Sequence, residues 1–460
     1  MAQLIDYSFA IGKEFNRKKA VNNQEYLEVA EQVHDYLETQ KVETEDGVYW
    51  KDVINLTTGG PASDKVDLSQ YGGSSGPLYY YLALYKVTGK EEYKNIVIKG
   101  ADYINKHWRD HIESVRNGDF YMEGLEYSYY LGVASVATAL AKIYEVFNRA
   151  EDRQTLVDIT DEIIKGGKFT ENGISWSFDK SPLGGGGTVF YLYRIYEILK
   201  DEKILEAANK GADQIVAEAI EDPRGGYAWT SYAHPNQTRV PNFECGTAGV
   251  GYTLAVAYEV SKNEKYLEAA KQAVAHLKAI AVKQGDGFLI PWHDNPDEET
   301  IFYVSTCHGP AGTSRLFYEL YKTTGDKSYL DDIASLYTGL RHLGVPEKQS
   351  VGYWNTVGIC CGGAGIAQFL INYNLVSGRE DVKEVAELTG SILLGRVEKQ
   401  SKGVAFPLAF ERVKPQNLSR GISYGAGASG VGAALIQLYL FFEGKYSWLR
   451  LFDDPYPVSQ

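Results

Sequence analysis

Apolar residues recur at helical spacing behind a Gly-x-x-Gly pattern, which occurs in seven copies along the chain, one of them ending in serine. The copies begin at residues 73, 132, 184, 246, 309, 362 and 427. Five residues past each copy stands a large apolar side chain: Tyr81, Leu140, Leu192, Leu254, Phe317, Leu370 or Leu435. Nine residues past it six copies have a tyrosine: Tyr85, Tyr144, Tyr196, Tyr258, Tyr321 and Tyr439. Offsets of five and nine share one helical face, so each copy is predicted to open a buried helix.

A second, more charged helix is predicted behind every copy except the last, as at 263–277 and 326–340. A matching segment at 23–37 precedes the first copy. Inner and outer helices are equal in number only if this N-terminal helix pairs with the C-terminal one. The repeat therefore predicts an all-α fold, an (α/α)7 toroid of seven helical hairpins that closes into a ring. We expect one domain over residues 1–460, with the repeats at about 20–445.

The loops in front of the glycine patterns are rich in aromatic residues, and they are expected to include short hairpins and to crowd one mouth of the ring. Four of the tryptophans, Trp176, Trp229, Trp292 and Trp354, lie in or near these loops. Residues directly before the glycines are expected to face the centre of the ring.

Composition narrows the class of protein. With 60 acidic and 46 basic residues the net charge is −14, which argues against nucleic-acid binding, because phosphate contacts need clustered Lys and Arg. No run of 18 apolar residues predicts a transmembrane segment, and the N-terminus lacks a signal-peptide pattern. The chain has only four cysteines, two of them adjacent, which does not suit a disulfide framework. These features favour a cytoplasmic protein.

Three of the four cysteines lie just in front of two successive glycine patterns. Cys307 and Cys360 each stand two residues before the first glycine of their patterns, and Cys361 follows Cys360 directly. Equivalent positions on adjacent inner hairpins are predicted to bring the three sulfurs together. Converging thiolates favour zinc, and three protein ligands leave a fourth position open, as in catalytic sites. The alternative is that the cysteines are small apolar fillers of a tight core. Cys245, one residue before Gly246, is a fourth ligand, a bystander or a functional thiol on this reasoning.

These glycine patterns and the motifs "TCHG" and "ICCG" resemble those of the lanthionine synthetase C-like (LanC-like) cyclases, with Cys361 in place of the family's usual zinc-binding histidine. The resemblance implies a Zn²⁺ bound by Cys307, Cys360 and Cys361. It also implies a reaction that adds a peptide cysteine thiol to dehydroalanine or dehydrobutyrine, with a dehydrated precursor peptide as substrate and a separate dehydratase as partner. Three cysteinates give the zinc site a formal charge of −1, which favours release of a reactive substrate thiolate.

Two departures from the family pattern concern the acid and base groups. Cys245 stands where the family has an active-site histidine, and Tyr303 stands where it has an arginine. His308, next to a zinc ligand, is the nearest substitute to protonate the enolate that the addition forms. Asp179 lies near the place of a family aspartate.

Further candidates and functions stay open. His234 and His293 are weaker candidate site residues in the loops. A zinc-bearing protein that binds a thiol or a peptide without turnover is one alternative function. A sugar hydrolase or epimerase is another, in which paired carboxylates act and the loop tryptophans stack on sugar rings.

Overall fold

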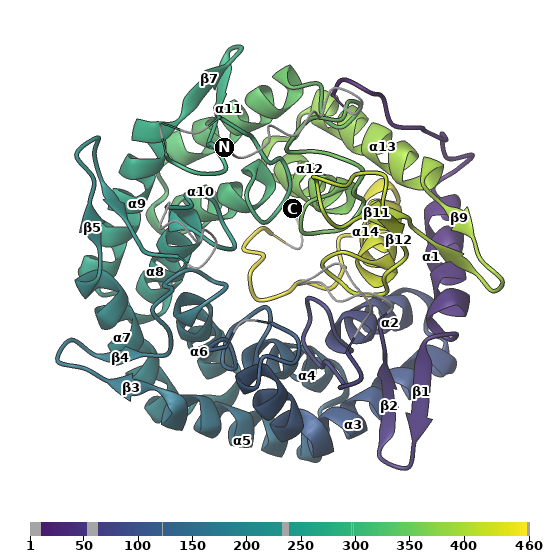
Figure 1. Cartoon of the computed structure of the whole chain (residues 1–460), viewed down its shortest axis with the longest axis horizontal. Helices are drawn as coiled ribbons and strands as arrows, with labels where there is room; N and C mark the ends of the chain where they lie inside the picture. Colours follow the sequence, from purple (N-terminus) through teal and green to yellow (C-terminus); the bar gives the residue numbers. More distant parts are fainter. Residues whose placement is uncertain are drawn as a thin grey trace.

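A computed structural model describes residues 11–52, 63–121, 123–231, 239–295, 297 and 299–457. Within them fourteen helices alternate between an inner and an outer layer of a ring (Figure 1). The inner helices are α2 (Ser75–Thr88), α4 (Val133–Phe147), α6 (Gly185–Leu199), α8 (Thr247–Ser261), α10 (Pro310–Thr324), α12 (Gly363–Ser377) and α14 (Ala428–Phe442). The outer helices are α1 (Gln24–Leu37), α3 (Glu91–Arg116), α5 (Ala150–Gly166), α7 (Glu202–Ala217), α9 (Glu264–Ile280), α11 (Ser328–His342) and α13 (Glu380–Gly395). The predicted toroid of seven hairpins is confirmed.

The two layers differ in which faces they bury. Inner helices such as α8 and α14 are buried on nearly all sides over most of their length, because they pack between neighbouring inner helices and the outer layer. Outer helices such as α9 bury one face and expose charged residues on the other. Every glycine pattern except the first places its first glycine as the residue that precedes the inner helix.

The ring closes as the repeat count predicts. Helix α1 packs against α14, at the other end of the chain. Asn23, at the start of α1, donates from Nδ2 to the carbonyl of Phe442, at the end of α14 (3.4 Å). The strand β10 (Val404–Ala405) also contacts α1.

Six antiparallel two-stranded hairpins join the helices. Short hairpins were expected in these loops, but they were expected at the mouth of the ring. They are β1 (Lys41–Thr44) with β2 (Gly47–Trp50), β3 (Lys168–Phe169) with β4 (Ile174–Ser175), β5 (Ile220–Glu221) with β6 (Tyr227–Ala228), β7 (Val282–Gln284) with β8 (Gly287–Leu289), β9 (Glu398–Lys399) with β10, and β11 (Leu408–Ala409) with β12 (Leu418–Ser419). The first five stand at the outer rim, each against the next outer helix around the ring (Figure 1).

The C-terminal segment, residues 445–457, runs into the centre of the ring (Figure 1). Its Trp448, Phe452 and Tyr456 are buried. Asp453 forms an ion pair with Arg315 of α10 (2.5 Å) and accepts a hydrogen bond from the hydroxyl of Tyr130 (2.9 Å). The segment therefore fills the inside of the ring, where it contacts the inner helices α8 and α10.

Within the described residues, no helix combines the length and the apolar composition that a membrane crossing requires.

Candidate metal centre and its cavity

A circle of backbone hydrogen bonds links the loops that lead into the inner helices. Each residue in it stands one or two places before the first glycine of its pattern. Six of the seven donate their N–H to the carbonyl of the equivalent residue in another loop, and the seventh, Tyr130, accepts at the end of the series. The bonds run from Leu183 to Glu244 (2.8 Å), Glu244 to Cys307 (2.9 Å), Cys307 to Cys360 (3.0 Å), Cys360 to Gly425 (2.9 Å), Gly425 to Tyr71 (3.2 Å) and Tyr71 to Tyr130 (3.3 Å). These bonds hold equivalent residues of different repeats side by side at the ring's centre.

The second glycine of the pattern allows these loops to pass close to the first turn of the inner helix, where a larger residue would not fit. A Cβ added at Gly312 would overlap the carbonyl oxygen of Thr306, and one added at Gly365 would overlap that of Ile359. Thr306 and Ile359 directly precede Cys307 and Cys360 in the chain. The loop therefore folds back onto the first helical turn, which fixes where each cysteine points.

Three sulfurs meet at one point of the circle. Cys361 Sγ lies 3.2 Å from Cys307 Sγ and 3.4 Å from Cys360 Sγ, and the three sulfurs all lie within 4.8 Å of one another. Cys307 and Cys360 are buried, and Cys361 is half-buried. Tetrahedral zinc at about 2.3 Å from each sulfur requires separations of about 3.8 Å, so small side-chain shifts suffice to accommodate it. The soft donor set and its spacing fit Zn²⁺.

The electrostatics of the three thiols are unequal. Hydrogen bonds from Cys307 and Cys360 lower the pKa of Cys361 to about 5. Burial raises the pKa of Cys307, and its contacts with the other two sulfurs add to the effect. Of the three thiols, Cys361 therefore has the greatest tendency to ionise, because the two neighbouring thiols donate to its sulfur.

A cavity of about 380 Å³ lies over the sulfurs. The aromatic side chains around it include Trp292, Tyr303, Trp354 and Phe410. Tyr303 stacks on Trp292, with ring centres 5.4 Å apart and planes inclined by 6°. The guanidinium of Arg412 lies 4.8 Å from the ring centre of Trp292. The cavity is therefore largely apolar, with thiols on one wall and a cation beside its aromatic wall.

Two of the four tryptophans proposed for sugar stacking lie elsewhere. Trp176 donates from Nε1 to the carbonyl of Ile163 (2.7 Å), and Trp229 donates to that of Ile215 (2.8 Å). Both indoles thus brace rim hairpins against outer helices, while Trp292 and Trp354 line the cavity. The aromatic argument for a carbohydrate site is correspondingly weaker.

His308 lines the cavity, edge-on to the ring of Tyr303 with 5.4 Å between centres. Burial lowers the pKa of its imidazole to about 3, so the ring is neutral in neutral solution. Its Nδ1 is buried and has no hydrogen-bond partner among the described residues. His293 is buried against Trp292 but is not among the described residues that line the cavity, and His234 lies outside the described residues.

Asp179 is fully buried and accepts a hydrogen bond from the backbone N–H of Ser181 (2.7 Å). Burial raises the pKa of Cys245, and the charges of Glu244 and Asp179 raise it further. Asp179 thus lies on the Cys245 side of the site. Cys245 lines the cavity, but it is not part of the three-sulfur cluster.

Two residues that the sequence analysis did not single out contact Cys360. The hydroxyl of Tyr71 donates to Cys360 Sγ (3.2 Å), and Glu244 Oε2 lies 3.6 Å from the same sulfur. Burial raises the pKa of the Glu244 carboxyl well above its usual range. Both residues stand two places before a glycine of the repeat, as Cys307 and Cys360 do. The register that located the cysteines was therefore the signal that could have found them.

A second cluster of possible metal ligands is occupied by ion pairs. Asp222, His276 and Asp294 lie within 4.8 Å of one another near the rim. Arg224 contacts the carboxylates of both Asp222 and Asp294 (2.8 Å each), and Arg239 contacts Asp222 (3.0 Å). Two cations neutralise the two carboxylates, so this cluster lacks the charge that would attract a metal ion.

Comparisons with known proteins agree with this architecture. The profile of the family described as lanthionine synthetase C-like protein matches residues 63–443. Nisin cyclase has a similar structure, with a TM-score of 0.58 and 15% identity over 83% of this chain and 94% of that chain. An inactive variant of an alpha-1,6-mannanase from Salegentibacter sp. HEL1_6 gives a TM-score of 0.43 and 16% identity over 91% of this chain and 99% of that chain. Cellobiose 2-epimerase from Bacillus thermoamylovorans B4167 gives 0.43 and 13% over 70% and 88%. A search of curated proteins finds no match.

The similarity to nisin cyclase shows the same helical ring, and the family profile covers most of the chain, including all three clustered cysteines. The chain therefore belongs to the lanthionine synthetase C-like protein family.

Proposed function

We propose that this protein is a zinc-dependent enzyme of the lanthipeptide cyclase type, which closes thioether rings in a dehydrated precursor peptide. The observation that carries the proposal is the convergence of Cys307, Cys360 and Cys361 on one wall of an aromatic cavity. These three cysteines would hold the zinc. When bound, zinc lowers the pKa of a substrate thiol and supplies thiolate at neutral pH.

The side chains around the sulfurs suit an addition that consumes no water. The aromatic wall of Trp292, Tyr303 and Trp354 offers an apolar surface to the dehydroalanine or dehydrobutyrine side chain. A site shielded in this way keeps water from competing with the thiol as a nucleophile. A peptide that has already been dehydrated is the expected substrate, so a separate dehydratase is the expected partner.

His308 is proposed to carry the proton. The substrate thiol loses its proton, its sulfur forms a bond to Cβ of the dehydro residue, and His308 passes a proton to Cα of the enolate that results. One S–H bond breaks, and one C–S bond and one C–H bond form. The linear and cyclised peptides therefore have equal masses. Asp179 is proposed as a second catalytic residue, on the side of the site where Cys245 lies. Its charge raises the pKa of the Cys245 thiol.

The test uses a synthetic peptide that carries one dehydroalanine and one cysteine. Incubation with the zinc-loaded protein is expected to remove the free thiol without a change of mass, faster than in buffer with zinc alone. Persistence of the thiol in the presence of fully zinc-loaded protein would contradict cyclase activity.

A second candidate function is binding of a thiol or a peptide without turnover. Cys245 and Tyr303, which stand where the family pattern has histidine and arginine, favour this alternative. Calorimetry with glutathione and with the same peptide separates the two functions. Saturable binding at the zinc site with no loss of thiol supports the binding protein, and loss of thiol supports the enzyme.

A further inference from the structure

The hydroxyl of Tyr71 points at one of the three clustered sulfurs, and it donates a hydrogen bond to Cys360 Sγ over 3.2 Å. We propose that Tyr71 is a positioning residue that withdraws electron density from the Cys360 thiolate and so makes the three sulfur ligands inequivalent. The proposal rests on the zinc site of the proposed function, but it does not depend on which reaction that site performs.

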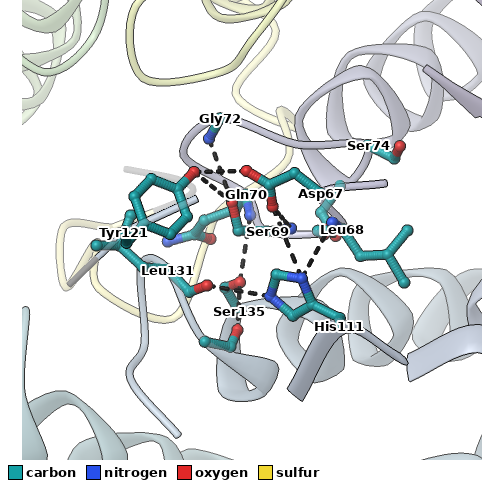
Figure 2. A network of polar contacts seen from close by, with 12 residues as sticks. Asp67, Leu68, Ser69, Gln70, Gly72, Ser74, His111, Tyr121, Leu131 and Ser135 are labelled. Atoms are coloured by element: carbon teal, nitrogen blue, oxygen red, sulfur yellow. Dashed lines mark hydrogen bonds and ion pairs between the residues drawn. The ribbon is translucent and has the colours of Figure 1, made fainter. Parts of the chain in front are cut away.

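The loop that carries Tyr71 is held in place by a buried polar network (Figure 2). Asp67 accepts hydrogen bonds from the backbone N–H of Ser69 (2.8 Å) and from the hydroxyl of Tyr121 (2.6 Å). Ser69 Oγ in turn accepts from the N–H of Gly72 (3.3 Å). These bonds fix the backbone on both sides of Tyr71.

His111 ties the same loop to the next one (Figure 2). Its Nδ1 accepts from the N–H of Leu68 (3.3 Å), so Nε2 carries the proton and donates to the carbonyl of Leu131 (3.0 Å). Leu131 follows Tyr130, whose carbonyl accepts from the N–H of Tyr71 (3.3 Å). The phenol is therefore presented to Cys360 from a preorganised backbone, as expected of a group that orients a metal ligand.

Tyr130 shows that the sulfur contact is not a general property of this position. It occupies the place equivalent to Tyr71 in the next repeat and lines the same cavity. Its hydroxyl donates instead to Asp453 of the C-terminal segment (2.9 Å). Of two tyrosines at equivalent positions, one thus contacts sulfur and the other contacts a carboxylate.

The physical effect follows from the charge on the sulfur. A hydroxyl that donates to a thiolate forms a charge-assisted hydrogen bond and lowers the energy of the sulfur lone pairs. Cys360 then donates less charge to the metal than Cys307 and Cys361 do. A less nucleophilic Cys360 is also less able to compete with the substrate thiol for the dehydro residue.

The experiment compares the full-length Tyr71→Phe variant with wild type, each loaded with Co²⁺ as a spectroscopic probe. Loss of the hydrogen bond is expected to shift the sulfur-to-cobalt charge-transfer absorption to lower energy and to weaken zinc binding about tenfold. Tyr130→Phe is the matched control, and it is expected to keep the wild-type spectrum and zinc affinity. A variant with 3-fluorotyrosine at position 71, a stronger donor, is expected to shift the band to higher energy.

Either of two results would overturn the proposal. One is a Tyr71→Phe variant with the wild-type spectrum and affinity, and the other is a Tyr130→Phe variant that changes both as much. Failure of the zinc site itself is recognised separately, because the wild-type protein would then show no charge-transfer band at all. Failure of cyclase activity leaves this spectroscopic comparison intact.

Discussion

Proton transfer at His308 is the residue-scale step on which the proposed addition depends. We expect His308→Asn to slow thiol loss from the dehydroalanine peptide at least about 100-fold, because positioned acid–base groups contribute about 10²–10⁴. Zinc content should stay at the wild-type level, since the ligands are unchanged. His293→Asn is the matched control, because His293 is buried nearby but is not among the described residues that line the cavity. Equal rates for the two variants would remove His308 from the mechanism.

A buried carboxyl on α10 gives a second residue-scale prediction, for the pH dependence of stability. Glu319 and Glu259 both contact the ammonium group of Lys322 (2.8 Å each). Burial raises the pKa of Glu319 to about 7, whereas Glu259, where burial is outweighed by Arg194 and Lys322, has its pKa lowered to about 2. The nearby cations thus stabilise the ionised form of Glu259 more than that of Glu319.

Because the pKa of Glu319 is raised in the folded state, its contribution to stability is fully present below the unfolded pKa, near 4.5, and is lost as the pH rises through 7. Relative to Glu319→Gln, the wild-type protein should therefore lose on the order of 2 kcal/mol of unfolding free energy between about pH 4.5 and 7. Urea unfolding of both proteins across this range measures the difference. Parallel pH profiles would show that Glu319 is ionised throughout.

At this scale the sequence predicts some site residues and not others. The repeat register places Cys307 and Cys360 correctly because glycine-led loops fold back in the same way in each repeat. It does not predict that the hydroxyl of Tyr71 meets a sulfur 289 residues away, while that of Tyr130 meets Asp453. Those partners depend on which chain segment crosses the ring at each point.

At the scale of the element, the start of α12 provides a matched pair of glycines. A Cβ at Gly365 would overlap the carbonyl oxygen of Ile359, whereas one at Gly363 would lie no closer than 3.2 Å to a neighbouring side chain. We expect Gly365→Ala to destabilise the protein by at least about 1–3 kcal/mol and to disturb zinc binding, because the overlap displaces the loop that carries Cys360. Gly363→Ala should be nearly neutral, since alanine favours the helix and the leucine side chain beside it can shift. Chemical denaturation tests both, and equal stabilities would contradict the close-approach explanation.

The loops were harder to predict than the helices. Helical periodicity runs over about fifteen residues in each inner helix, but four of the six hairpins have strands of only two residues, which carry no readable alternation. Their position at the rim follows from contacts such as the indole of Trp229 with the carbonyl of Ile215. Such a contact requires the neighbouring outer helix to be in place.

At the scale of the whole molecule, the sequence predicted that the ring closes. It did not predict that the C-terminal segment fills the centre of the ring. Seven inner and seven outer helices require α1 to pair with α14, which the structure confirms. The C-terminal segment has no periodicity that would place it in the centre. Its position depends on buried partners from distant repeats, such as Arg315 for Asp453.

The ion pair between Arg315 and Asp453 makes this filling testable. Asp453→Asn should cost about 3–5 kcal/mol of unfolding free energy, because it leaves the buried Arg315 guanidinium without its counter-charge. The double variant Arg315→Met/Asp453→Leu, which removes both charges, should recover much of this loss. Urea unfolding of the single and double variants gives the comparison. A double variant no more stable than Asp453→Asn would contradict the explanation that the unpaired guanidinium causes the loss.

The central claim, that the ring brings three thiols of two adjacent repeats onto one zinc ion, is tested most directly by the zinc content of the purified protein. We predict one zinc per chain in wild type, essentially none after replacement of Cys307, Cys360 or Cys361 by alanine, and one again in Cys245→Ala, the cysteine of the cavity that lies outside the cluster. Full zinc content in any of the three cluster variants, with the fold intact by circular dichroism, would contradict it.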